Sequence, residues 1–215
     1  MFTGLIQATG TLLAARRLAA GIHIEIDAHG LQPRLIAVGD SIAVNGVCLT
    51  ATEVDGHRFG ADVSRETLSR TTGLDAALDP AAAAGARLVN LETSLALGDK
   101  LGGHLVSGHV DGVGTVVGCA PAGESLALVV RAPAELARYL AVKGSLAVDG
   151  VSLTVNRVDD GVTDRAGGAA GSDVHINLIP HTVAATAFRE LAVGRRVNLE
   201  IDLIARYVAR MMELR

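Results

Sequence analysis

Hydrophobic and polar residues alternate in short runs along this chain, with the period of two that is typical of β-strands. Residues 22–27 (IHIEID) alternate cleanly, as expected for a strand with one face buried and one face in water. Further candidate strands of similar length lie at residues 126–130, 174–178 and 197–201. Glycines separate many of these runs, so the chain is expected to consist mainly of short strands joined by turns.

Two turn signals indicate hairpins. Residues 41–50 contain Asn45-Gly46 between Val-rich arms, and Asp149-Gly150 repeats this dipeptide type further along. Short strands joined in this way favour a closed antiparallel barrel, because closure removes vulnerable sheet edges.

Two other segments show helical patterns. Residues 133–140 open with proline and carry a glutamate in the first turn, which favours a helix start. Residues 203–214 place their hydrophobic side chains on one helical face, made of Leu203, Ile204, Tyr207, Val208, Met211 and Met212, opposite Arg206, Arg210 and Glu213. A helix of about 12 residues is marginal alone in water, so this face must pack on the chain's own barrel or on another copy.

The chain also contains an internal repeat. Residues 38–50 (VGDSIAVNGVCLT) match residues 142–154 (VKGSLAVDGVSLT) at an offset of 104, and VNLE occurs at residues 89–92 and again at 197–200. We therefore predict two homologous modules of roughly 100 residues, each with its own core, and a tail: residues 1–102, 103–202 and 203–215. Such a pseudo-twofold molecule can offer two similar sites to two similar ligands.

Composition narrows the class of protein. The 215 residues are 49% hydrophobic and 20% charged, as in ordinary soluble globular proteins. Aromatic residues make up 2% and tryptophan is absent, which argues against a platform for stacking bases or an aromatic sugar groove. The net charge of −4 argues against sequence-independent binding to nucleic acid.

The cysteines and the apolar segments indicate the cellular compartment. Two cysteines, one per module, cannot build a disulfide framework and favour reduced thiols. The opening MFTGLIQATG has no cationic segment before an apolar run, so it does not resemble a signal peptide. No apolar stretch approaches the roughly 20 residues of a membrane span. We expect a cytoplasmic protein without membrane contact.

A glycine-rich segment at residues 102–109 carries two histidines, His104 and His109, at the module junction. They are five residues apart and no cysteine or carboxylate completes a ligand set, so no metal site is predicted. Glycine permits close approach of the backbone to a ligand, which favours a binding site over two purely structural histidines.

The two modules differ at equivalent positions. Cys48 corresponds to Ser152, and Asn45 corresponds to Asp149. Cys48 is either a small buried hydrophobic residue or a functional thiol. Asp149 either caps its own turn or serves a ligand. Similar frames with different functional groups would give two similar ligands different roles.

Several segments together resemble the riboflavin synthase alpha-chain family over the whole length of the chain. They are MFTG at residues 1–4, SIAVNGVCLT at 41–50, DVSRET at 62–67, LGGHLVSGHVDG at 101–112, SLAVDGVSLT at 145–154 and NLIPHT at 177–182. The resemblance implies an all-β fold with two homologous six-stranded antiparallel Greek-key barrels in tandem plus a C-terminal α-helix. It also implies a homotrimer held together by these helices.

The implied activity is that of a transferase in riboflavin biosynthesis. Two molecules of 6,7-dimethyl-8-ribityllumazine dismutate by transfer of a four-carbon unit, giving riboflavin and 5-amino-6-(D-ribitylamino)uracil. Each barrel would bind one lumazine, and the reacting pair would meet between the first barrel of one subunit and the second barrel of a neighbour. The resemblance implies no metal and no organic cofactor, and lumazine synthase is a candidate partner.

The family's functional residues carry over as follows. The first ligand would contact Gly4, Leu5, Ile6, Cys48, Leu49, Thr50, Asp62, Val63, Ser64, Arg65, Glu66 and Thr67. The second would contact Gly108, His109, Val110, Lys143, Ser152, Leu153, Thr154, Asn177, Leu178, Ile179, Pro180, His181 and Thr182. The hypothesis for catalysis is that Ser41 and Cys48 serve the first ligand, whereas the second is served by His109, Asp149, Ser152 and Thr154.

Two features depart from the family's pattern. His181 stands where many relatives carry an acidic residue, and the Gly- and Ala-rich residues 163–173 form an insertion without a counterpart in the first module. Two other classes of protein are alternatives. A non-catalytic lumazine- or flavin-binding relative would be expected to let one module drift, yet both keep their motifs. A flavin-dependent oxidoreductase would need a Gly-rich strand-to-helix turn for a nucleotide, which this chain lacks.

Overall fold

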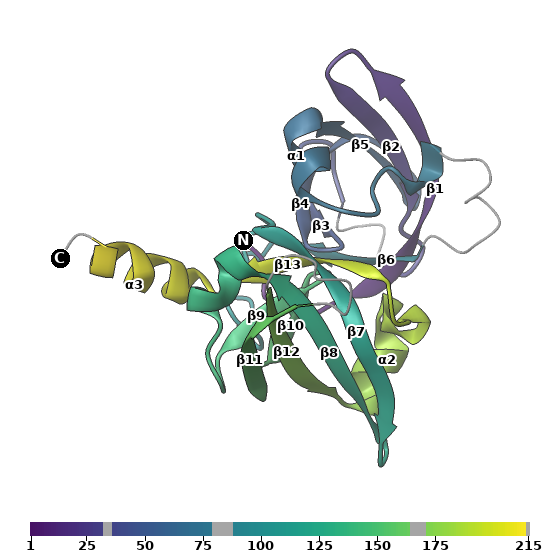
Figure 1. The fold of residues 1–215 in the computed structure, drawn as a ribbon. Coiled ribbons are helices and arrows are strands. Elements are labelled where there is room, and N and C mark those ends of the chain that lie inside the picture. The colour runs from purple at the N-terminus through teal and green to yellow at the C-terminus, as the bar shows by residue number, and fades with distance from the viewer. Residues whose placement is uncertain (32–35, 79–87, 164–170, 214–215) are drawn as a thin grey trace.

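The first module forms a closed antiparallel barrel in the computed structural model, which describes residues 1–31, 36–78, 88–163 and 171–213 (Figure 1). The strand order around the barrel is β1-β2-β5-β4-β3-β6. The Greek-key character lies in β2, which pairs with β5 and not with β3, its successor in the chain. Its strands are β1 (Ala8–Leu18), β2 (Gly21–Asp27), β3 (Ser41–Val44), β4 (Val47–Asp55), β5 (Arg58–Ser64) and β6 (Leu88–Thr93).

The second module has the same strand order, with one strand broken in two. Its strands form one seven-stranded sheet of order β10-β9-β13-β7-β8-β12-β11, in which the two edge strands, β10 and β11, together take the place of β4. We call this curved sheet and its core the second barrel. Two residues separate them, at the point where β4 carries a bulge between Ala51 and Glu53. The expectation of six strands is thus met by seven segments. They are β7 (Gly112–Ala122), β8 (Ser125–Pro133), β9 (Ser145–Val148), β10 (Val151–Thr154), β11 (Arg157–Val162), β12 (Gly171–Leu178) and β13 (Arg196–Ile201).

Short helices follow β5 and β12, and the alternation of the sequence did not predict them. In α1 (Arg65–Arg70) the hydroxyl of Ser64 accepts a hydrogen bond from the Thr67 amide at 3.1 Å and caps the helix. The equivalent α2 (Pro180–Ala185) starts on its proline instead. Two 3-10 helices accompany them, η2 (Ala76–Leu78) and η5 (Ala187–Glu190).

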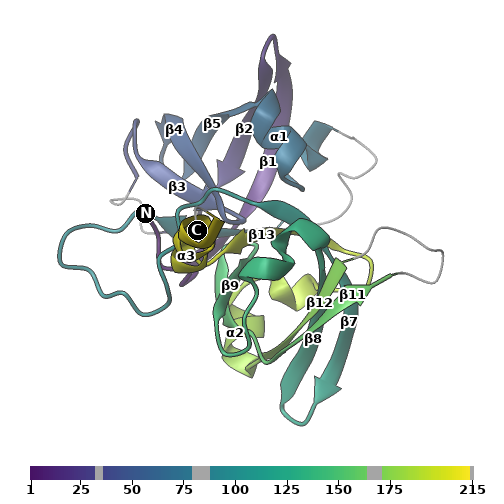
Figure 2. The same ribbon diagram turned by 60° about the vertical axis from the view of Figure 1, so that its left-hand side comes forward.

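The two helices that the sequence did predict differ in outcome. The segment expected at residues 133–140 is a 3-10 helix, η4 (Ala134–Tyr139), whose end is marked by the Leu140 amide donating to the Ala137 carbonyl. The tail forms α3 (Leu203–Glu213), which extends away from the second barrel in Figure 1 and is seen end-on in Figure 2. No helix in the described part of the chain is long and apolar enough to cross a membrane. Of the Gly- and Ala-rich insertion, residues 164–170 lie outside the described residues.

Each barrel encloses its own hydrophobic core. Side chains such as Ile24, Phe59 and Leu91 fill the first, and Leu128 and Leu199 help to fill the second, all almost fully buried. The alternation of the strands places these residues inward and polar residues outward. The cores therefore give each repeat a separate source of stability.

The barrels meet through their equivalent hairpin turns, as the pseudo-twofold repeat requires. The side-chain amide of Asn90 donates to the Asp149 carbonyl at 2.9 Å, and that of Asn198 donates to the Asn45 carbonyl at 3.0 Å. These asparagines belong to the repeated VNLE motif at the start of β6 and β13. The motif thus joins the two modules as well as forming strands.

Candidate functional site

The segments that precede the two barrels pair with each other across the pseudo-twofold axis. We call residues 1–6 the first arm and residues 105–110 the second arm. Phe2 and Val106 form an antiparallel bridge, with amide-to-carbonyl distances of 2.7 and 3.1 Å. Both side chains are buried and pack with Ala43, Ala147 and the half-buried Cys48. The arms are thereby fixed between the barrels.

A buried glutamate anchors each arm to the barrel that follows it. The Glu92 carboxylate accepts hydrogen bonds from the Thr3 amide and hydroxyl, both at 2.7 Å, and from the Gly4 amide at 3.0 Å. Glu200 does the same for Ser107 and Gly108, at 2.6 to 2.9 Å. Burial raises the pKa of both carboxyl groups, and the donated hydrogen bonds oppose this effect. Three donors on one buried carboxylate fix the turn in each arm.

Beyond these turns each arm reaches across to the other barrel. The Gly4 carbonyl accepts a hydrogen bond from the Ser152 amide at 2.8 Å, and the Gly108 carbonyl accepts one from the Cys48 amide at 2.9 Å. Ile6 packs against the second core, whereas Val110 packs against the first.

This exchange differs from the grouping expected from the sequence. The residues at 4–6 lie beside the Ser152 hairpin of the second barrel, and those at 108–110 lie beside the Cys48 hairpin of the first, whereas the sequence grouped each arm with the other hairpin. Glycine is favoured at the crossing points, because Gly4 and Gly108 have φ angles of 74° and 79°, in the left-handed region. A Cβ at Gly4 would also lie 2.6 Å from the Ser152 Cβ.

On the first barrel, alternation along β4 separates binding candidates from core residues. Cys48 and Thr50 share one face of the strand: Cys48 is half-buried and Thr50 is exposed. Leu49, between them, is in the core. Ser41 pairs with Thr50 across the hairpin and is half-buried. The candidate face therefore combines a thiol with two hydroxyl groups.

The segment at residues 62–67 runs from the end of β5 into α1. The Asp62 carboxylate lies 2.7 Å from Nδ1 of His23, a buried residue on the neighbouring strand β2. Val63 points into the core, so only its backbone is available to a ligand. Arg65 and Glu66 are exposed on α1. His23 was not singled out from the sequence, and its pairing with Asp62 depends on the strand register.

The second barrel repeats this layout. On β10 Ser152 is half-buried and Thr154 is exposed, and Leu153 between them is in the core. The Lys143 side chain is exposed, and its backbone adopts a φ of 67° while its amide donates to the Val155 carbonyl at 2.7 Å. The segment at 177–182 joins β12 to α2. In that segment Leu178 is in the core, Thr182 is half-buried, and the side chains of Asn177, Ile179, Pro180 and His181 are exposed.

The two histidines of the glycine-rich segment have different surroundings. His109 is exposed on the second arm. His104 is buried, and its Nδ1 lies 2.7 Å from the Ser152 hydroxyl, while its Nε2 has no hydrogen-bond partner. Burial lowers the pKa of His104, against the opposing charge of Asp202, so the neutral ring is favoured. No local pattern in the sequence predicts the pairing of His104 with Ser152, because the two residues are 48 positions apart.

Asp149 lies in the interface between the modules and is buried. Its Oδ1 accepts a hydrogen bond from the Asn198 amide at 2.8 Å, and its Oδ2 lies 3.6 Å from Arg195. Asn45, its counterpart, accepts from the Asn90 amide at 2.8 Å. Burial raises the pKa of Asp149 to about 6, against the opposing effects of the Asn198 hydrogen bond and of Arg195. The carboxylate thus holds the start of β13 rather than the amides of its own turn.

Comparison with known proteins places this doubled arrangement in a class. The lumazine binding domain model matches the chain twice, at residues 3–94 and 107–202. The chain is therefore a tandem pair of domains of this type, in agreement with the two barrels. Crystal structures of LumP share the fold: the complex with riboflavin has a TM-score of 0.76 and 22% sequence identity, covering 94% of this chain and 99% of that one.

The full-length relatives are more specific. Riboflavin synthase of Mycobacterium tuberculosis (strain ATCC 25618 / H37Rv) is 42% identical over 218 residues, which cover 99% of this chain and 98% of that protein. Riboflavin synthase of Photobacterium phosphoreum is 37% identical, covering 99% and 89%. The chain belongs to the riboflavin synthase family.

Proposed function

We propose that the protein is a riboflavin synthase, which converts two molecules of 6,7-dimethyl-8-ribityllumazine into riboflavin and 5-amino-6-(D-ribitylamino)uracil. A four-carbon unit passes from one lumazine to the other, so the two products together contain all the atoms of the two substrates. The observation that carries the proposal is the pair of equivalent outward faces, Cys48 with Thr50 and Ser152 with Thr154, one on each barrel. Two like faces suit two molecules of one substrate.

The work of the protein in this reaction is to orient two rings and to move protons. Correct orientation of two reactants can supply on the order of 7–11 kcal/mol of the barrier, and a placed acid or base supplies about 10²–10⁴ in rate. Recognition of each ring would use backbone amides and carbonyls, because several residues of both binding segments turn their side chains into the cores. The reaction needs no metal ion or organic cofactor, because the lumazine ring itself accepts electrons.

The exchanged arms support a particular grouping of residues around each ligand. The ligand on the first barrel would lie against Cys48, Ser41 and the residues at 62–67, with His109 brought from the second arm, since Gly108 is hydrogen-bonded to Cys48. The ligand on the second barrel would lie against Ser152 and Thr154, with the residues at 4–6 and 177–182, and with Lys143. One group must remove a proton from the 7-methyl group, and another must add to the partner ring or activate water.

His104, which is buried beneath the candidate face, would orient the hydroxyl of Ser152. The unprotonated Nδ1 of a neutral imidazole at 2.7 Å can accept a hydrogen bond from the hydroxyl and so direct the oxygen lone pairs toward a ligand. Asp149 would act through the backbone of β13, because its carboxylate is directed into the module interface. These assignments make Ser152 a contact residue and the other two positioning residues.

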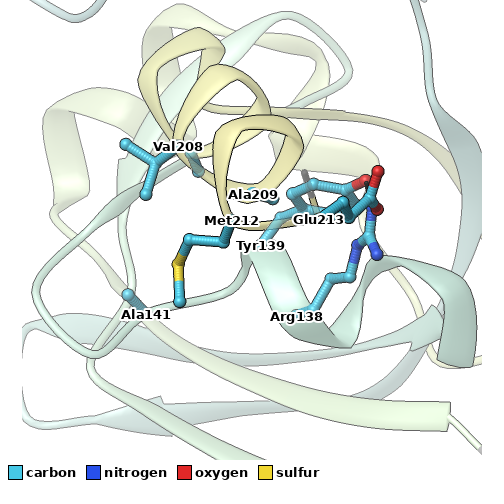
Figure 3. A pocket seen from close by; sticks show the side chains of 8 residues that line it. Arg138, Tyr139, Ala141, Val208, Ala209, Met212 and Glu213 are labelled. Atoms are coloured by element: carbon cyan, nitrogen blue, oxygen red, sulfur yellow. Dashed lines mark hydrogen bonds and ion pairs between the residues drawn. The ribbon is translucent and has the colours of Figure 1, made fainter. Parts of the chain in front are cut away.

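We also propose that the protein acts as a homotrimer assembled through α3. On this helix Tyr207, Met211 and Met212 are 63 to 69% exposed, and Ile204 and Val208 are also exposed. Beside it, a groove between α3 and η4 is lined by Tyr139, Ala141, Val208 and Met212 and closed at one end by the Arg138–Glu213 ion pair (Figure 3). An apolar helix face with five exposed hydrophobic side chains favours association in water. A trimer would bring the first barrel of one subunit to the second barrel of the next.

A non-catalytic binding protein is the alternative function, favoured by the likeness to LumP. Incubation of the protein with 6,7-dimethyl-8-ribityllumazine distinguishes the two. A synthase releases fluorescent riboflavin and the uracil product in equal amounts, one of each per two lumazines consumed. A binding protein changes the lumazine spectrum but forms neither product. The variants Cys48→Ala, His109→Ala and Ser152→Ala should remain folded and turn over more slowly, and full activity in all three would remove the residue assignments while leaving the reaction in place.

A further inference from the structure

Three metal-ligating side chains converge on the first barrel, away from the candidate functional site. One ligand atom each of Asp27, His29 and His57 lies within 4.8 Å of the other two. Asp27 ends β2, His29 follows two residues later, and His57 lies in the turn between β4 and β5. Among the described residues, this group is where three histidine, cysteine or acidic side chains lie as close neighbours. Its first and last members are 30 positions apart in the sequence, so the fold brings them together.

The backbone holds the two loops that carry these side chains. The Ala28 amide donates to the His57 carbonyl at 2.8 Å, and Ala28 itself is buried. Asp27 pairs with Arg58 in the register of β2 and β5. The His29 amide donates to Oδ1 of Asp27 at 2.9 Å, which fixes the orientation of the carboxylate. The ligands therefore sit on a frame built from a strand end and a hairpin turn.

The separation of the ligand atoms, none more than 4.8 Å apart, is close to the spacing around a tetrahedral ion. Bonds of about 2.0–2.1 Å to nitrogen and oxygen place neighbouring ligand atoms roughly 3.4 Å apart around zinc. Nε2 of His57 lies 3.7 Å from Oδ1 of Asp27. The rings of His29 and His57 are 4.7 Å apart and almost perpendicular, at 87°, so they do not stack face to face and block the space. Small rotations of exposed or half-buried side chains bring all three atoms onto one ion.

We propose that Asp27, His29 and His57 bind a divalent transition-metal ion of the zinc class, with water completing the coordination. Two imidazoles and one carboxylate suit zinc, cobalt or nickel better than calcium or magnesium, which prefer oxygen ligands. The ion links the end of β2 to the β4–β5 turn and so stabilises the barrel by mass action. His57 precedes β5, whose seven residues end at Ser64, so the ion lies roughly 20 Å along the strand from that end of the candidate lumazine face.

The test is a titration of the full-length protein with zinc chloride, followed by calorimetry and by thermal unfolding in the same buffer. One zinc per chain and a Tm that rises with zinc concentration are expected for the parent protein. His57→Gln and His29→Gln should each bind zinc at least roughly tenfold more weakly and lose most of the rise in Tm. Circular dichroism of the metal-free variants confirms that each is folded.

A matched control comes from His175→Gln. His175 also lies beside a carboxylate, with Nε2 2.9 Å from Asp159, but that pair has Arg157 as its third member instead of a second histidine. This variant should bind zinc as the parent does. Equal zinc affinity of His57→Gln and the parent would overturn the proposal. So would a thiolate-to-cobalt absorption band on substitution with cobalt, because it would place the ion on Cys48 or Cys119. Lumazine turnover is measured in parallel, so that its absence bears on the proposed function alone.

Discussion

Gly46 and Gly150, at equivalent hairpin turns of the two barrels, lie backbone to backbone on the pseudo-twofold axis. A Cβ added to either glycine would lie 2.7 Å from the backbone nitrogen of the other. Their φ angles of 78° and 79° are also in the left-handed region. This contact, together with the hydrogen bonds of Asn90 and Asn198, holds the hairpins that carry Cys48 and Ser152, so the two candidate binding faces have a fixed relation to each other.

Gly150→Ala should destabilise the protein by more than backbone strain alone. The left-handed conformation costs an alanine roughly 1–2 kcal/mol, and the close approach to Gly46 adds displacement of one turn from the other. Gly194→Ala is the matched control, because Gly194 has a φ of 92° with no atom within 4 Å of an added Cβ. Urea unfolding should give a larger loss for Gly150→Ala, and equal losses would show that the contact contributes nothing.

Phe2→Ala should abolish turnover as well as reduce stability. Removing a fully buried phenylalanine typically costs about 3–5 kcal/mol, and here it also frees both arms, which place residues at both candidate faces. Phe59→Ala serves as the control, since Phe59 is equally buried but lies within the first core. At a temperature where both variants are folded, Phe59→Ala should retain most of its kcat. A fully active Phe2→Ala protein would contradict the role of the arms.

Asp149→Asn should make stability less dependent on pH. Because burial raises the Asp149 pKa from 3.8 to about 6, the folded state holds this proton more tightly than the unfolded state does. The contribution of Asp149 is therefore present below pH 3.8 and is lost as pH rises to about 6, on the order of 3 kcal/mol in total. Asparagine keeps the acceptor for the Asn198 amide, as Asn45 does for Asn90.

Free energies of unfolding measured at pH 5 and pH 7 test this expectation. The parent protein should lose more stability over that interval than Asp149→Asn does, with the exposed Asp55→Asn as the control for removing a charge. The same slope in parent and Asp149→Asn would refute it. Retained kcat in Asp149→Asn supports a positioning role, and a loss of kcat in the folded variant supports the direct role at the second ligand.

Glu200→Gln should loosen the second arm and slow turnover. The carboxylate accepts three hydrogen bonds, from Ser107 twice and from Gly108, and an amide NH₂ facing one of these donors leaves it unpaired at a cost of about 1–3 kcal/mol. Glu25→Gln, on a partly exposed 3.5 Å pair with Arg58, should change stability by less than about 0.5 kcal/mol. Amide hydrogen exchange should be faster at Gly108 in Glu200→Gln than in the parent, and unchanged protection there would count against the anchor.

Tyr207→Asp should break the proposed trimer. A carboxylate on the apolar face of α3 would have to be buried without a partner on assembly, which costs several kcal/mol. Val193→Asp, at a position of similar exposure, should leave assembly unchanged. Sedimentation equilibrium gives the mass of each protein. A trimeric Tyr207→Asp protein, or a monomeric parent at micromolar concentration, would exclude assembly through this face.

The sequence by itself determined the local features. The alternation at residues 22–27 correctly predicts β2, and the apolar face of residues 203–214 correctly predicts α3. The Asn45-Gly46 and Asp149-Gly150 dipeptides correctly predict two hairpins. Each rests on chemistry within a few positions of the chain, such as the period of side chains or the φ angle that a turn needs. The repeat extended these local features to two modules without any knowledge of how the modules touch.

Only the tertiary structure decided which distant segments meet. The crossing of the arms places Gly4 beside Ser152 and Gly108 beside Cys48, and neither pairing follows from sequence order, which suggested the reverse. The pairing of His104 with Ser152, and the meeting of Asp27 with His57, depend in the same way on strand register and on the packing of one barrel against the other. Such contacts are set by the joint burial of surfaces from segments far apart in the chain, which no local pattern records.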